Sequence, residues 1–78
     1  MEREEVFNKL KEIFNDVFDR DIELNESTQA KDVDGWDSLT HITLIAQIEE
    51  EFDMKFTMKE VLGMKNVGEM VDIILREA

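Results

Sequence analysis

Two side chains with catalytic potential, Ser38 and His41, lie three residues apart directly after Asp37. On a helix, residues at this spacing share a face, with their Cβ atoms about 5–6 Å apart. A catalytic triad also needs a third group that orients the base, and an oxyanion hole. The surrounding sequence lacks the Gly-x-Ser-x-Gly pattern of a nucleophile elbow. We therefore expect no catalysis here, and we expect His41 to face solvent or a partner.

Ser38 stands where an acidic loop is predicted to turn into a helix. Asp37 is a good N-cap, which leaves Ser38 in the first helical turn. The N-terminus of a helix favours anions, because its first N–H groups are unpaired and the helix dipole is positive there. We predict that Ser38 is a site for attaching a phosphorylated group. The residues alone leave open the alternative of an ordinary serine at a helix N-terminus.

Trp36, the single tryptophan, precedes Ser38 by two residues. A ring of this size buries a large area, so we expect it to pack over the loop and the helix beneath. The alternative is that part of the ring lines the approach to Ser38.

The acidic loop at residues 32–37 has residue types found in calcium loops. If Gly35 is position six of such a loop, positions one and twelve fall on Ala30 and His41, where an acid and a bidentate glutamate are needed. One histidine and no cysteine also exclude a histidine- or thiolate-based zinc site. We expect no metal site.

The composition limits the possible functions. The chain has 78 residues and a net charge of −11, so we expect one small domain spanning residues 1–78. The negative charge excludes nucleic acid as a partner and favours fast docking on basic proteins. No apolar run is long enough for a membrane span, and the acidic residues 1–5 do not resemble a signal or transit peptide. We expect a monomer in the cytoplasm.

Hydrophobic periodicity predicts an all-α fold. Apolar residues at steps of three and four predict helices at residues 2–18 and 38–52. Capping signals at Thr57 and Asn66 open a short helix that ends near Leu62, and a last helix. Residues 19–37 between the first two helices form a long ordered loop. The result is a small bundle of three main helices plus one short helix.

The same periodicity predicts which side chains are buried. Ile22, Leu24 and Val33 should anchor the loop in the core. The phenylalanines and the five methionines could form an adaptable interior, because methionine repacks easily. The second helix should bury Leu39, Ile42, Ile45, Ala46, Ile48 and Phe52, with Leu44 at the edge of this stripe.

Asp-Ser-Leu at residues 37–39, followed by a long helix ending in Glu-Glu-Glu-Phe at residues 49–52, resembles the acyl carrier protein family. Nearly the whole chain fits the pattern of that family. The resemblance implies that a phosphopantetheinyl transferase attaches 4′-phosphopantetheine from coenzyme A to the Ser38 hydroxyl through a phosphodiester. The thiol of this arm then carries an acyl group as a thioester. The chain would be a carrier without enzymatic activity.

The resemblance also assigns roles to other residues. Asp37 would belong to the recognition signal and Leu39 would contact the transferase, with Trp36 beside them. Glu49 and Glu50 would meet basic patches on the enzymes that load and transfer acyl groups. The remaining side chains on the face that partners contact would be Thr40, His41 and Thr43.

Two departures from the general fatty acid carriers stand out. Those carriers have acids two and five residues after the serine, where this chain has Thr40 and Thr43, and an alanine where it has Trp36. The Trp-Asp-Ser-Leu form looks like specialised, stand-alone carriers of bacterial gene clusters. This implies a specialised fatty acid, lipid or polyketide-type pathway. An acyl chain inserting between the helices is a further hypothesis.

Two alternatives remain at the level of sequence. An aminoacyl or peptidyl carrier would use the same attachment to Ser38 with a different cargo. An unmodified acidic interaction domain would dock on a basic protein without any prosthetic group.

Overall fold

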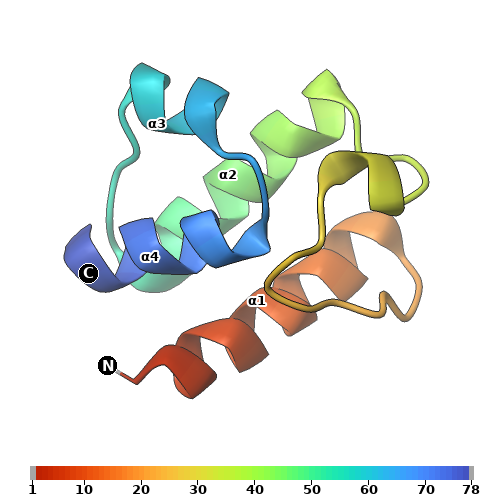
Figure 1. Ribbon diagram of the computed structural model, residues 1–78, viewed down its shortest axis with the longest axis horizontal. Coiled ribbons are helices and arrows are strands. Elements are labelled where there is room, and N and C mark those ends of the chain that lie inside the picture. Colours follow the sequence, from red (N-terminus) through yellow and green to blue (C-terminus); the bar gives the residue numbers. More distant parts are fainter. Residues whose placement is uncertain (1, 78) are drawn as a thin grey trace.

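The computed structural model describes residues 2–77, and over that range its regular elements are all helices, with no strand (Figure 1). Figure 1 shows the long loop after α1 passing along one side of the bundle, with η1 close to the start of α2. The predicted all-α fold with three main helices and one short helix is confirmed. The elements are α1 (Arg3–Phe18), the 3-10 turn η1 (Ala30–Asp32), α2 (Ser38–Phe52), α3 (Met58–Gly63) and α4 (Val67–Glu77).

Helix α1 buries apolar residues that recur at steps of three and four along the sequence. It begins after Glu2, whose backbone N–H lies 3.4 Å from the Glu5 carboxylate, and it ends at Asp19, which takes a left-handed conformation with φ of 52°. Residues three and four apart stack along the inner side of the helix, as its periodicity requires. Its buried residues are Val6, Leu10, Ile13 and Phe14, and Phe7, Val17 and Phe18 pack partly buried against the core.

Helix α2 turns a different face to the core from the predicted one. Leu44, expected at the edge, is fully buried, whereas Leu39 and Ile42 are 78% and 63% exposed and Ala46 is also exposed. Apolar residues cover more than one stripe of this helix, so periodicity cannot decide which stripe packs inward. The prediction was wrong for these positions and correct for Ile45, Ile48 and Phe52, which are buried.

The loop between α1 and α2 is anchored as predicted and is also docked on α4. Ile22, Leu24 and Val33 are buried. In addition, the backbone N–H of Val67 donates to the carbonyl of Thr28 over 2.9 Å. The first N–H groups of a helix lack partners within the helix. The Thr28 carbonyl of the loop therefore supplies an acceptor for the N–H of Val67 at the start of α4.

Helix α3 buries no side chain, although its capping box forms as predicted. The Thr57 hydroxyl accepts from the N–H of Glu60 over 3.1 Å, and the Glu60 carboxylate accepts from the N–H of Thr57 over 2.8 Å. Asn66 accepts from the N–H of Glu69 over 2.9 Å at the start of α4. Helix α4 buries Val67, Gly68, Met70, Val71, Ile73 and Ile74.

The expected methionine-rich interior forms only in part. Met54 and Met70 are buried, Met64 is half-buried, and Met58 is 72% exposed; Met1 lies outside the described residues. Met58 lies on α3, none of whose side chains is buried. Within residues 2–77, no helix combines the length and apolar character that crossing a membrane requires.

Candidate functional site

Asp37 caps α2 through a reciprocal set of hydrogen bonds. Its carboxylate accepts from the N–H groups of Leu39 and Thr40, each over 3.0 Å, and the Thr40 hydroxyl accepts from the N–H of Asp37 over 2.7 Å. The backbone bond from Thr40 is the main cause that lowers the pKa of Asp37 below its usual value. The Thr40 side chain is therefore occupied in capping and is half-buried.

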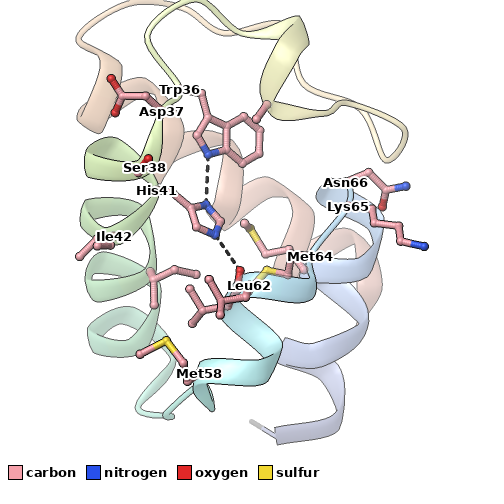
Figure 2. A pocket seen from close by; sticks show the side chains of 14 residues that line it. Trp36, Asp37, Ser38, His41, Ile42, Met58, Leu62, Met64, Lys65 and Asn66 are labelled. Atoms are coloured by element: carbon pink, nitrogen blue, oxygen red, sulfur yellow. Dashed lines mark hydrogen bonds between the residues drawn. The ribbon is translucent and has the colours of Figure 1, made fainter.

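Ser38 is the first residue of α2 and is exposed, with its side chain beside the helix N-terminus (Figure 2). The turn that delivers it depends on Gly35, whose φ of 89° favours glycine. The Gly35 carbonyl accepts from the Thr40 hydroxyl over 2.7 Å, which ties the turn to the helix. This geometry holds an accessible hydroxyl at a rigid, anion-favouring position.

Trp36 packs on the core and also makes a polar contact next to Ser38. Its ring meets Phe14 edge-on, with centroids 5.1 Å apart, and its indole N–H donates to Nδ1 of His41 over 3.1 Å. Trp36 also lines the same cavity as Ser38. The structure thus unites the two alternatives considered for this residue: its ring packs inward and one edge lines the approach to Ser38.

His41 links α2 to α3. Its Nε2 lies 3.1 Å from the carbonyl oxygen of Val61, and its ring plane is inclined by 28° to that of Trp36, with the ring centroids 6.0 Å apart. An indole nitrogen can only donate, so Nδ1 of His41 is the acceptor and Nε2 carries the proton that is donated to Val61. His41 is half-buried and both of its ring nitrogens are used internally, so the expectation that it faces solvent holds only in part, and its contact with a partner stays a prediction.

An apolar cavity of about 610 Å³ lies between α2 and α3, and Ser38 is one of its lining residues. This cavity was not predicted from the sequence. The feature that could have indicated it is the short helix α3, which is rich in apolar residues but buries none of them in the core. Figure 2 shows the side chains around it. They include Trp36, His41, Ile42, Met58, Leu62 and Met64.

The two glutamates expected to meet partners have different surroundings. The Glu49 carboxylate accepts from the N–H of Phe56 over 2.8 Å, and its side chain is only 20% exposed, 4.0 Å from the Lys55 ammonium. Glu50 is exposed. Glu49 therefore holds the segment between α2 and α3 in place, whereas Glu50 is exposed, and contact of either glutamate with a partner stays a prediction.

The predicted site residues fall into two groups along α2. Trp36, Asp37 and His41 gather around Ser38 at its start, and Glu49 and Glu50 lie near its end, about three helical turns from Ser38. The exposed side chains along this helix include Leu39, Ile42, Thr43, Ala46, Gln47 and Glu50.

Comparisons with known proteins agree in sequence and structure. The sequence matches the family model described as "Phosphopantetheine attachment site" over residues 8–74. It is 36% identical over 76 residues to an acyl carrier protein of Lactobacillus acidophilus, covering 95% of this chain and 94% of that protein. It is 39% identical over 71 residues to an acyl carrier protein of Clostridium perfringens, covering 88% and 92%. The fold matches the solution NMR structure of holo acyl carrier protein from Geobacter metallireducens with a TM-score of 0.86 and 40% identity, over 92% of this chain and 84% of that chain.

Proposed function

Since the chain belongs to the acyl carrier protein family, we propose that Ser38 is the residue to which its 4′-phosphopantetheine is attached. The chain is a carrier and not an enzyme, and its cofactor is bound covalently. The observation that carries the proposal is the exposed Ser38 hydroxyl in the first turn of α2, held by the Asp37 cap on the edge of an apolar cavity.

The attachment chemistry suits this position. The Ser38 oxygen forms a bond to the phosphorus of coenzyme A that bears the pantetheine, while the phosphoanhydride bond to the adenylate breaks. The hydroxyl proton passes to the transferase. The phosphodiester that results carries one negative charge at the N-terminus of α2, where the helix dipole favours an anion.

Carriers of this family act with a phosphopantetheinyl transferase and with acyl-handling enzymes. For this chain, we assign their docking to the exposed side of α2, which carries Leu39 and Thr43 near Ser38 and Glu50 near the end of the helix. The net charge of −11 favours enzymes with basic patches and speeds their association. Asp37 keeps its capping role and would be recognised together with Leu39.

The cavity beside Ser38 supports an acyl cargo that inserts between the helices. Its lining is mostly apolar, so a hydrocarbon chain would gain from leaving water. The chemical shifts of core methyl groups around Met64 and Met70 should change when the free thiol of the phosphopantetheine arm is converted to an acyl thioester. If the changes stay within the surroundings of Ser38, the cargo remains outside. A specialised pathway, a single domain over residues 1–78, a monomeric state and a cytoplasmic location stay predictions.

The test uses the two serines of the chain, Ser27 and Ser38. The protein is incubated with coenzyme A and a broad-specificity phosphopantetheinyl transferase, and its intact mass is measured. One phosphopantetheine should add to the wild type and to Ser27→Ala, and none should add to Ser38→Ala. Addition to Ser38→Ala, or no addition to the wild type, contradicts the assignment. In the second case, an unmodified acidic interaction domain becomes the better explanation.

A further inference from the structure

Three polar groups from three different elements form one hydrogen-bonded chain across the wall of the cavity. The indole N–H of Trp36, from the loop, donates to His41 of α2, whose Nε2 contacts the Val61 carbonyl of α3. Figure 2 shows both contacts as dashed lines. We refer to this set of Trp36, His41 and the Val61 carbonyl as the bridge.

The bridge lies between two parts of the cavity. In Figure 2, Ser38 and Ile42 are on one side of His41, and Met64 and Asn66 are on the other. The residues on the Ser38 side are open to solvent, since Ile42 is 63% exposed. On the other side, Met64 is half-buried. A chain that runs from Ser38 toward Met64 would therefore meet the bridge on its way.

The bridge is also one of few attachments of α3. That helix buries no side chain, and apart from its own caps it is joined by His41 to α2 and by the ion pair of Glu60 with Arg76 to α4. Because none of its side chains is buried, α3 has little apolar burial to hold it, and these polar bonds contribute to its position. Breaking the contact of His41 with Val61 would let the C-terminal end of α3 move away from α2.

We propose that the bridge determines which acyl groups enter the interior of this carrier. Short acyl groups stay on the Ser38 side with the bridge intact, and longer groups break it to reach Met64 and Met70. The proposal rests on the attachment of the cargo at Ser38, and it makes Trp36 and His41 positioning residues that set a threshold of chain length.

The threshold follows from two opposing effects. Each CH₂ group buried beyond the bridge favours the inserted state by about fourfold. Opening the bridge leaves the indole N–H, the imidazole and a carbonyl without partners in apolar surroundings, which disfavours insertion by roughly a hundredfold. About three to four methylenes must therefore pass the bridge before insertion prevails.

The single tryptophan provides a direct readout, because the protein gives one indole N–H resonance in a ¹H–¹⁵N NMR spectrum. In the unmodified protein, the ring nitrogens of His41 should show the tautomer protonated at Nε2, and the indole N–H should exchange slowly with water. The holo protein is then loaded with straight-chain acyl groups from acetyl to dodecanoyl. The indole resonance should stay in place for the short members and shift, with faster exchange, beyond one length.

Two variants locate the threshold in the bridge. Trp36→Phe removes the donor but retains an aromatic ring against Phe14, and His41→Phe removes both ring nitrogens. In each, amide exchange at Val61 should be about 3- to 10-fold faster than in the wild type, as the loss of a typical hydrogen bond implies. The methyl shifts of Met64 and Met70 should then respond to shorter acyl groups. Gln47→Ala, at an exposed position of α2, is the matched control and should leave the threshold unchanged.

An indole resonance that stays constant through dodecanoyl, or that already shifts with acetyl, overturns the proposal. So does an unchanged threshold in Trp36→Phe, which decides the matter if His41→Phe does not fold. Failure of the attachment itself is seen separately, as an intact mass without phosphopantetheine. The tautomer of His41 and the exchange of the indole N–H in the unmodified protein do not depend on that attachment.

Discussion

The backbone N–H of Gly68 donates to the carbonyl oxygen of Glu26 over 2.8 Å, and a Cβ atom at position 68 would lie 3.0 Å from the same oxygen. The absence of a side chain at Gly68 thus allows the loop between α1 and α2 to lie against the start of α4. The neighbouring bond from Val67 to Thr28 fixes the loop on the other side. The carbonyl of Glu26 therefore has little room to move.

Gly68→Ala should destabilise the protein, even though alanine is the better helix former. The added methyl group forces apart backbone atoms that are joined by a hydrogen bond, and overpacking of this kind costs about 1–3 kcal/mol. We expect a net loss of about 1 kcal/mol in the free energy of unfolding, measured by urea denaturation.

Gly63→Ala is the matched control for this substitution. Gly63 is helical, and an added Cβ at this position would meet no atom within 4 Å. Its free energy of unfolding should be unchanged or raised by up to about 1 kcal/mol, because alanine restricts the unfolded chain. If both variants behave alike, the contact with Glu26 does not restrict position 68.

The sequence predicts those parts of the fold that depend on local signals. The N-cap at Asp37 and the capping box at Thr57 formed as expected, because such caps involve residues only two or three positions apart. The loop anchors Ile22 and Leu24 were also predicted correctly. They are the apolar residues of a polar segment, so burial was their only favourable environment.

Features that depend on distant parts of the chain could not be predicted in this way. Apolar side chains occur around most of α2, so the sequence alone does not show that Leu44 is buried and Leu39 exposed. The partner of His41 is a carbonyl twenty residues away, and a carbonyl is present in every residue. Only the packing of α3 beside α2 selects that contact and creates the cavity.

Glu49→Ala and Glu50→Ala should affect different properties. Glu49→Ala removes the acceptor for the N–H of Phe56 and should lower the free energy of unfolding by about 1 kcal/mol. Glu50→Ala should leave stability unchanged. It should instead lower the rate at which a basic phosphopantetheinyl transferase modifies the protein at low salt, because exposed charges act mainly on association.

Unfolding by urea and the rate of modification, followed by intact mass over time, separate the two effects. Equal losses of stability in both variants would show that the hydrogen bond to Phe56 is not significant. A modification rate that is insensitive to Glu50→Ala would place the docking surface elsewhere on the protein.

Added salt should stabilise the protein. Its net charge of −11 is confined to a molecule whose principal extents are 28, 25 and 21 Å. The Debye length is about 30 Å at 0.01 M salt and about 8 Å at 0.15 M, so like charges repel across the whole molecule only at low salt. The midpoint of thermal unfolding should rise over this range.

A variant with less charge checks the origin of this effect. Glu12 and Glu23 are exposed, and the double variant Glu12→Gln, Glu23→Gln carries two fewer negative charges. Its unfolding midpoint should be higher at low salt and should rise less on addition of salt. A wild-type midpoint that falls with salt would mean that attractive ion pairs, such as that of Arg3 with Glu26, outweigh the repulsion.

The Asp37 cap should make a contribution to stability that is lost in acid. The pKa of Asp37 is held below its usual value of 3.8, first by the backbone hydrogen bond from Thr40. A carboxyl with a lower pKa in the folded state stabilises that state above its unfolded pKa, and this contribution disappears as pH falls through the folded pKa. The wild type should therefore be more stable than Asp37→Asn near neutral pH, and the difference should shrink as pH falls from about 5 to about 2.

Glu60→Gln should show the same trend, because the backbone hydrogen bond from Thr57 lowers the pKa of Glu60. Urea denaturation at each pH measures both differences in the free energy of unfolding. The repulsion among the other acids is common to variant and wild type and cancels in each difference. A difference that stays constant into acid would show that ionisation of the Asp37 cap does not stabilise α2.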